Sequence, residues 1–206
     1  MKDIPVFTTE YGVASLVLNQ IPYRETAYVI IQSSGDLEKL IKECRDFCIA
    51  AGAKRIYARG KGLEKIYPLY TRLIQMERLN IGIPSTARLL PVTEENREKW
   101  RQCCNAHMQK VPLAAYMTEE KCKALSGYFV EKDGSVIGLG AVSGSRIEVV
   151  IGLENGAGRE VLSALCQGIK GDIITLEVAD TNEPAMGLYT AFGFQKTAEL
   201  ECWYEI

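Results

Sequence analysis

The residues best suited to chemistry lie in Leu176–Phe194, which reads LEVADTNEPAMGLYTAFGF. A tyrosine phenol has an ordinary pKa of ~10, so at neutral pH Tyr189 keeps a proton that it can donate. Asn182 precedes it where a strand gives way to a helix, and Gly193 follows it where positive φ would end that helix. The alternative is that Tyr189 and Phe192 are ordinary core aromatic residues on one helical face.

A second candidate is a glycine-containing loop, Leu153–Gly158 (LENGAG), which precedes a helix expected over Glu160–Gln167. Amides at a helix N-terminus lack partners within the helix, and the helix dipole favours an anion there. Glycine lets a ligand approach the backbone closely. Glycine-rich turns before helices are common, so by itself this loop favours a structural turn. Its place two elements before the segment with Asn182 and Tyr189 favours instead a phosphate cradle formed by Gly156, Ala157 and Gly158.

Two carboxylates are candidates for a general base, which would take a proton from an attacking nitrogen. Glu148 lies in an apolar strand expected over Arg146–Ile151, and Glu177 lies in the strand Ile173–Val178, which should be its neighbour. A glutamate at a strand end that points into solvent is the alternative for Glu148. His107, the only histidine, is a further candidate, although a single histidine on a helix more often has a structural role.

Hydrophobic periodicity and turn residues place these candidates in an α/β chain. The N-terminal part is expected to be β-β-α-β-α, with strands at Val13–Leu18, Ala27–Ile31 and Lys54–Arg59 and helices at Leu37–Ala51 and Tyr67–Leu79. The second part should add helices at Glu94–His107 and Glu119–Leu125 and strands at Arg88–Pro91, Gly127–Glu131 and Val136–Val142, with a last strand from Phe194. Gly and Pro near residue 84 predict two domains, 1–84 and 85–206.

Composition narrows the class of protein. The 206 residues include 47% hydrophobic ones, and the formal net charge is −2 with no basic block. Nucleic acid and anionic membranes are therefore not expected partners. No apolar run is long enough to span a membrane and the N-terminus lacks a signal-peptide pattern, so a cytoplasmic protein is expected.

Cysteine usage favours a reduced protein without a metal site. The seven cysteines are scattered, no CxxC occurs, and there is one histidine, whereas zinc sites need clustered ligands. Cys44 and Cys48 fall on the apolar face of an expected helix, where a free thiol behaves as a small hydrophobic group.

The succession of Asn182, Ala185, Leu188-Tyr189 and Gly193-Phe194 resembles the C-terminal signature of the GNAT superfamily, the GCN5-related N-acetyltransferases. The resemblance spans roughly residues 88–206. It implies a mixed central β-sheet flanked by helices, preceded here by the smaller β-β-α-β-α domain. It also implies acetyl-CoA as co-substrate, with Tyr189 protonating the leaving thiolate and Asn182 contacting or supporting the cofactor.

The family's pyrophosphate loop reads Gln/Arg-x-x-Gly-x-Gly/Ala, and Gly156, Ala157 and Gly158 match its second half. Leu153 departs from it, since Gln or Arg is expected there, and Glu154 opposes an anion that Arg159 can offset. The resemblance further implies that backbone groups on the central strand, near Val149–Ile151, polarise the acyl carbonyl. The cofactor-binding set is accordingly Val149, Ile151, Gly156, Ala157, Gly158, Arg159, Asn182 and Tyr189, with Tyr189 and Glu148 catalytic.

The resemblance implies transfer of an acetyl group to a primary amine of a small molecule or peptide, by direct attack in a ternary complex. A different class of function stays open, namely a non-catalytic GNAT-fold module that binds acyl-CoA or a partner. The N-terminal part looks like a degenerate GNAT-like half, in which Tyr70 would be the counterpart of Tyr189. A homodimer is also left open.

Overall fold

The computed structural model describes residues 5–82 and 84–206, and the chain forms two compact units. Unit 1 comprises the residues up to Leu73 together with Leu200–Ile206, and unit 2 comprises Ile74–Glu199. Strands β5 (Leu69–Leu79) and β11 (Gln195–Glu205) contribute residues to both units. The division into domains of residues 1–84 and 85–206 stays a prediction.

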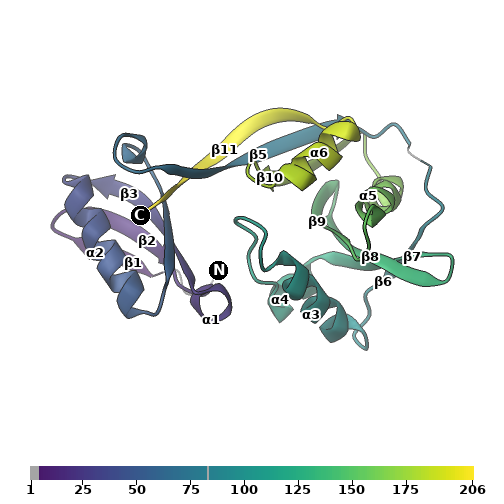
Figure 1. The fold of residues 1–206 in the computed structure, drawn as a ribbon, viewed down its shortest axis with the longest axis horizontal. Helices are drawn as coiled ribbons and strands as arrows, with labels where there is room; N and C mark the ends of the chain where they lie inside the picture. Colours follow the sequence, from purple (N-terminus) through teal and green to yellow (C-terminus); the bar gives the residue numbers. More distant parts are fainter. Residues whose placement is uncertain (1–4, 83) are drawn as a thin grey trace. The chain divides into compact units, whose positions relative to one another are not determined.

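Unit 1 is a sheet covered on one face by a single long helix. Its strand order is β1-β2-β3-β4-β11, in which β3 and β4 are parallel and the other neighbours are antiparallel. Helix α2 connects β3 to β4 and packs against β2 and β3 (Figure 1). The elements that begin in this unit are β1 (Val6–Thr9), β2 (Gly12–Val17), α1 (Ile21–Arg24), β3 (Thr26–Ser34), α2 (Leu37–Ala50), β4 (Arg55–Arg59) and the 3-10 turn η1 (Leu63–Lys65).

The sequence of α2 explains both its ends and its buried face. Asp36 is the N-cap, and its Oδ1 accepts a hydrogen bond from the Lys39 amide at 3.2 Å. Leu40, Ile41, Cys44 and Cys48 follow at helical spacing and are buried against the sheet, as the sequence predicts. The start of α2 is therefore occupied by a carboxylate of the chain itself.

Unit 2 contains the larger part of the sheet, in the order β11-β5-β10-β9-β8-β7-β6. β9 and β10 are parallel, while β6 to β9 are antiparallel neighbours. The strands are β6 (Arg88–Pro91), β7 (Ser126–Lys132), β8 (Ser135–Ser143), β9 (Arg146–Gly152) and β10 (Ile173–Ala179). The helices are α3 (Arg97–Met108), α4 (Glu119–Ala124), α5 (Ala157–Gly168) and α6 (Glu183–Ala191).

Two hydrophobic clusters cover the opposite faces of this sheet. On β8, Leu139 packs with Trp100 of α3, whereas a Cβ added at Gly140 would lie 2.6 Å from Leu165 of α5. The α5 side chains thus pack directly onto the glycines of β8 on one face, and α3 and α4, which lie side by side in Figure 1, cover the other. Trp100 is completely buried and donates from its indole nitrogen to the Tyr128 carbonyl at 2.9 Å, so it is a core residue.

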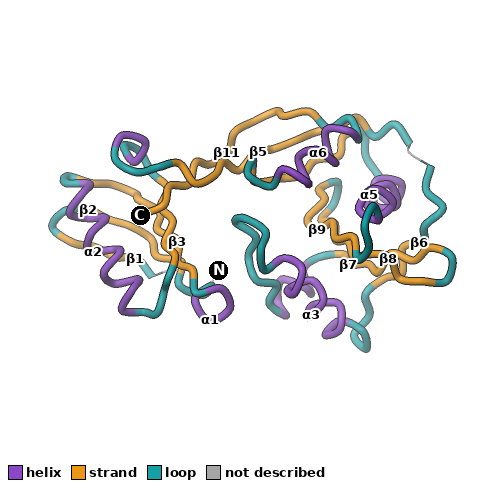
Figure 2. Tube along the Cα trace, in the orientation of Figure 1, coloured by secondary structure: helices purple, strands orange, loops and turns teal. Residues whose placement is uncertain are grey.

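The prediction of a helix over Tyr67–Leu79 is wrong, because this segment is the strand β5, drawn as strand over its whole length in Figure 2. Its buried residues, Thr71, Ile74 and Met76, fit a helical spacing in part, but β5 lies between β11 and β10, where pairing decides its conformation. The expected β-β-α-β-α order is corrected accordingly. Tyr70 lies on this strand and stacks on Tyr57 at 4.0 Å, so it is no helical counterpart of Tyr189.

The other predicted helices and strands occur in the predicted order. The prediction of a mixed β-sheet flanked by helices is confirmed. The Asp133-Gly134 turn joins β7 to β8, with both residues at positive φ, 51° and 80°. Missed by the sequence analysis were β1 and the single-turn helix α1.

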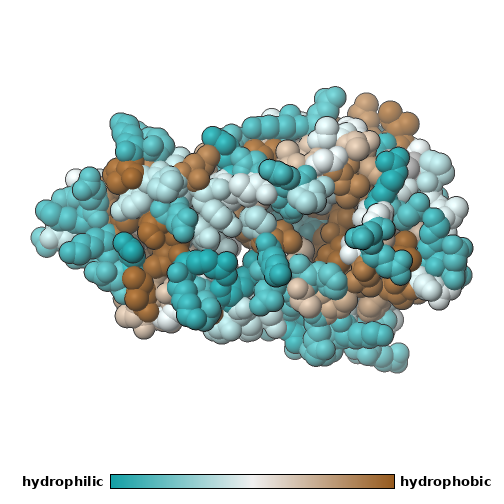
Figure 3. Space-filling model, in the orientation of Figure 1, coloured by the Kyte–Doolittle hydropathy of each residue, from teal (hydrophilic) through white to brown (hydrophobic). Residues whose placement is uncertain are grey.

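Three further features of the protein are the distribution of hydrophobic residues on the surface, the length of the helices and the grouping of metal-binding side chains. On the face drawn in Figure 3, polar residues surround separate hydrophobic spots. Within residues 5–82 and 84–206, no helix is long and apolar enough to cross a membrane. Nor do these residues contain three metal-binding side chains grouped closely enough to hold an ion.

Replacement of Asp36 tests the start of α2. Asp36→Ala should lower the free energy of unfolding by about 1 kcal/mol, because the Lys39 amide loses its acceptor. Asp36→Ser keeps an N-cap acceptor and should remain close to the wild type. Equal stability of Asp36→Ala and Asp36→Ser in urea titration would contradict a capping role.

Candidate functional site

The central feature of unit 2 is that β9 and β10 pair over only part of their length. Within the described part of the chain, Arg146 is opposite Thr175 and Ile147 is opposite Leu176, and the pairing ends there. Both strands continue, β9 to Gly152 and β10 to Ala179. The backbone of β9 beyond Ile147 stays paired with β8 but not with β10, so the sheet opens between two parallel strands.

A β-bulge marks the point where the strands part. On β8, Val142 is opposite Ile147 and Ala141 is opposite Val149, so Glu148 is an extra residue without a partner. The bulge reverses the alternation of β9, because Ile147 packs on the α5 side whereas Val149 and Ile151 pack on the α3 side. The predicted residues Val149 and Ile151 therefore lie on the diverging segment.

The predicted phosphate loop lies at the end of this segment. Gly156 is the N-cap of α5, with φ +83° and no capping side chain. A Cβ on Gly152, the last residue of β9, would lie 2.6 Å from the Gly158 nitrogen, so the glycine there allows the start of α5 to sit on the strand end. Gly156, Ala157 and Gly158 thus lie beside the opening, at a helix start that no carboxylate of the chain caps.

Tyr189 lies on α6, which follows β10, and its side chain belongs to the core on the α5 side. It is 9% exposed and meets the Phe194 ring edge-on, with centroids 6.0 Å apart. Burial raises the pKa of Tyr189 to about 12, so the phenol is protonated throughout the neutral range. Among the described residues no group forms a hydrogen bond with its hydroxyl.

Two contacts join the C-terminal part of α6 to the start of α5. A Cβ on Gly158 would lie 3.4 Å from the Leu188 side chain, and the Arg159 guanidinium lies 5.0 Å from the centre of the Phe192 ring. Asn182 is the N-cap residue of α6, but its side chain makes no capping hydrogen bond. The amide of Asn182 is consequently available to another partner.

The two predicted bases are joined by a guanidinium that the sequence analysis did not single out. Arg146 Nε lies 3.0 Å from Glu148 Oε1, and Arg146 Nη1 lies 3.0 Å from Glu177 Oε1. Ile147 beside Arg146, and Leu176 and Val178 beside Glu177, pack on the α5 side, so strand alternation puts Arg146 and Glu177 on the other face. Glu148 is the bulged residue, and its ion pair with Arg146 brings its carboxylate to the same place. Glu148 is therefore ion-paired, not a side chain that simply points into solvent.

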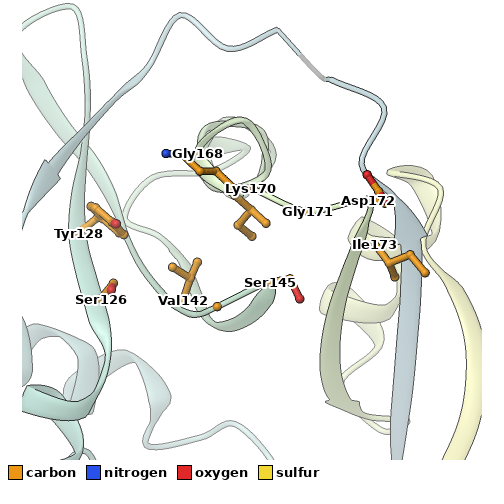
Figure 4. A pocket seen from close by; sticks show the side chains of 11 residues that line it. Ser126, Tyr128, Val142, Ser145, Gly168, Lys170, Gly171, Asp172 and Ile173 are labelled. Carbon is orange, nitrogen blue, oxygen red and sulfur yellow. The ribbon is translucent and has the colours of Figure 1, made fainter.

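Other candidates lie elsewhere. His107 is exposed on α3 and its Nδ1 lies 2.9 Å from the Cys103 carbonyl oxygen of the preceding turn, a local contact. A cavity of about 640 Å³ is lined by residues around Tyr128, Ser145 and Gly168–Ile173 (Figure 4). This cavity lies at the C-terminal end of α5, about 18 Å along the helix from the glycine loop, and holds none of the predicted site residues.

The sequence analysis missed Arg146 and Gly152. Arg146 opens its strand two positions before Glu148, on the same side of an extended chain, and that spacing was a usable signal. Gly152 ends an apolar strand directly before the LENGAG loop, where a glycine indicates close backbone approach.

Comparison with solved structures assigns the fold. A GCN5-related N-acetyltransferase from Kribbella flavida aligns with 99% of this chain and 89% of its own, with a TM-score of 0.60 at 12% identity. The chain has the GNAT fold. Another GCN5-related N-acetyltransferase, from Sphaerobacter thermophilus, aligns with 94% of this chain and 76% of its own, with a TM-score of 0.56 at 11% identity.

A functionally unknown conserved protein from Staphylococcus epidermidis shares the GNAT-like arrangement, aligning with 98% of this chain and 93% of its own (TM-score 0.60, 10% identity). No family model and no curated protein matches the sequence. The resemblance expected from the Asn182–Phe194 signature is thus confirmed at the level of the fold.

A pair of glycine substitutions tests how closely α5 sits on β9. Gly152→Ala should lower the free energy of unfolding by about 1–3 kcal/mol, because the new methyl group would meet the Gly158 backbone. Gly187→Ala, within α6 and with no atom near its Cβ position, should instead raise it by about 0.5–1 kcal/mol. Equal shifts in denaturant unfolding would show that the close approach at Gly152 is not real.

Proposed function

We propose that unit 2 binds an acyl-CoA in the opening between β9 and β10 and transfers its acetyl group to a primary amine. The observation that carries this proposal is the early end of the β9–β10 pairing, after Ile147 and Leu176. It leaves the β9 backbone from Glu148 onward without a strand partner on that side, and backbone amides and carbonyls need partners. An extended chain with its own amide groups, such as pantetheine, would satisfy them.

The residues around the opening fit such a ligand. Amides of Gly156, Ala157 and Gly158 would hold the pyrophosphate at the start of α5, with Arg159 adding positive charge. Backbone groups of Val149 and Ile151 would face the pantetheine and the acyl carbonyl, and Asn182 would contribute its uncommitted amide. Acetyl-CoA supplies an acyl group and a thiolate leaving group, and the chain supplies position and protons.

Tyr189 is proposed as the general acid. In the transfer, a bond forms between the amine nitrogen and the acyl carbon while the carbon–sulfur bond breaks, and the sulfur takes a proton. The raised pKa keeps that proton on Tyr189, and the hydroxyl has no competing acceptor among the described residues. The amine must lose a proton as well, and Glu148 on the opposite side of the sheet is proposed to accept it.

A non-catalytic GNAT-fold module that binds acyl-CoA or a partner is the second candidate, and it is kept because the loop departs from the family's pyrophosphate loop. Leu153 packs against the hydrophobic cluster on the α3 side, so it offers no polar group to a phosphate, and Glu154 is an exposed negative charge in the same loop. The two candidates differ in turnover. An enzyme releases free CoA thiol when acetyl-CoA is incubated with an amine panel, whereas a binding module is only stabilised by acetyl-CoA.

The acyl-CoA site is assigned to unit 2 alone. In unit 1, the equivalent parallel strands β3 and β4 pair through five residue pairs, Thr26–Ile30 with Arg55–Arg59. The helix that follows β3 is capped by Asp36, whose charge opposes a phosphate. Unit 1 therefore offers neither an opening between these strands nor a vacant helix start.

Gly158→Asp tests the phosphate cradle. The new carboxylate would stand beside amides proposed to hold the pyrophosphate, so acetyl-CoA affinity should fall at least about tenfold, or about 1.4 kcal/mol. Calorimetry should give a binding stoichiometry of about one per wild-type chain. Ser135→Asp adds the same charge at the β7–β8 turn and should leave the affinity unchanged; an unaltered affinity in folded Gly158→Asp would refute the loop assignment.

Tyr189→Phe tests the general acid. The ring and its packing are kept while the proton donor is lost, so turnover should fall at least about tenfold with little change in acetyl-CoA affinity. Tyr128→Phe, beside the cavity at the far end of α5, should behave like the wild type. Unchanged turnover of Tyr189→Phe would mean that water protonates the thiolate, and a wild type without turnover on any amine would favour the binding module.

A further inference from the structure

Arg146 contacts both candidate bases at the point where β9 and β10 separate. Besides the two contacts at 3.0 Å, its Nη2 donates a hydrogen bond to Glu148 Oε2 at 3.4 Å, whereas the Nε contact with Glu148 is an ion pair without hydrogen-bond geometry. One guanidinium therefore spans two strands and reaches three carboxylate oxygens. Its side chain is 43% exposed, and those of Glu148 and Glu177 are 25% and 27% exposed.

The backbone fixes where this arginine stands. Arg146 is in register with Thr175, and the Thr175 amide donates to the Ser145 carbonyl at 3.1 Å, so the strands are fastened together directly beside it. Glu148 is the bulged residue, whose side-chain direction the β8 ladder does not determine. Something other than strand pairing must therefore orient the Glu148 carboxylate, and the Arg146 contacts do so.

The planar shape of the guanidinium, more than its charge, can orient the Glu148 carboxylate. A partly exposed ion pair contributes little to stability, typically under about 1 kcal/mol. A guanidinium, however, presents its nitrogens in one fixed plane, so Nη2 can hold Glu148 while Nη1 contacts Glu177, an arrangement that a lysine ammonium reproduces poorly. Without the cation, two carboxylates would face each other across neighbouring strands and repel.

We infer that Arg146 is a positioning residue, which holds the Glu148 carboxylate toward the acyl-transfer site by bridging it to Glu177. This inference rests on the proposed acyl transfer in unit 2. Arg146 itself touches neither the acyl group nor the thiol. The bridged trio keeps one net negative charge, so it also favours the approach of a cationic amine.

The experiment compares Arg146→Ala and Arg146→Lys with a matched control, Arg88→Ala. Arg88 also pairs with a glutamate across neighbouring strands of the same unit, since its Nη2 donates to Glu131 Oε1 and Oε2, at 2.9 and 2.8 Å. The readouts are kcat/KM for the amine, acetyl-CoA affinity and melting temperature. Activity is measured with and without guanidinium ion at non-denaturing concentration.

For Arg146→Ala, kcat/KM for the amine should fall at least about tenfold while acetyl-CoA affinity stays within about twofold. Guanidinium should restore part of that activity in Arg146→Ala and none in Arg88→Ala, which should be unimpaired. Arg146→Lys should fall between the wild type and Arg146→Ala. In a Glu148→Gln background, Arg146→Ala should cause no further loss, because the group that it positions is gone.

Several results would overturn the inference: unchanged or raised activity in Arg146→Ala, an equal loss in the Glu148→Gln background, or full activity in Arg146→Lys. If Arg146→Ala does not fold, Arg146→Lys takes its place. The same criteria then apply to Arg146→Lys alone and to Arg146→Lys combined with Glu148→Gln. A wild type that turns over no amine would refute the proposed transfer itself, which is a separate outcome.

Discussion

The short ladder between β9 and β10 is the constraint on which the rest of unit 2 depends. Two residue pairs join β9 to β10. The extra residue Glu148 then reverses the alternation of side chains along β9, and beyond it β9 pairs with β8 but not with β10. Buried backbone groups without partners are costly, so a strand edge exposed in the middle of a sheet calls for an occupant. The glycine at 152, the start of α5 and the start of α6 all lie around this edge, which is why one irregularity organises the whole candidate site.

Unit 1 provides an internal comparison. It repeats the local arrangement of an antiparallel pair, a helix and a parallel strand, as β2-β3-α2-β4 beside β8-β9-α5-β10. This repetition supports the hypothesis of a degenerate GNAT-like half. The differences concern function: the parallel strands of unit 1 stay paired from Thr26 to Ile30, and Asp36 fills the helix start. The same arrangement of strands and helix can thus have its two parallel strands paired along their length or separated at one end, depending on a few residues at the strand and helix ends.

Local sequence signals predicted what local interactions decide. The Asp133-Gly134 turn, the cap of α2 at Asp36 and the end of α6 at Gly193, with φ +83°, follow from backbone preferences of single residues. The strand β5 was not predicted, because the spacing of its apolar residues fits both a helix and a strand. Its partners β10 and β11 lie far away in the sequence. The bulge at Glu148 and the bridge from Arg146 to Glu177 were equally hidden, since both depend on the register between β8, β9 and β10. The glycine loop was found from sequence, but its position against Gly152 was not.

The environment of Tyr189 bears on whether it is simply a core aromatic residue. Its ring packs against Phe194 and the surrounding cluster, and a phenylalanine would supply the same apolar surface. No described residue forms a hydrogen bond with the hydroxyl, yet it is not among the fully buried polar atoms without a partner, so the small exposed part of this residue includes the hydroxyl. Phe192, by contrast, has no polar group, and its ring lies under Arg159, as expected of a residue whose role is packing. The hydroxyl of Tyr189 is therefore reachable from outside the core, which the proposed role as a proton donor requires.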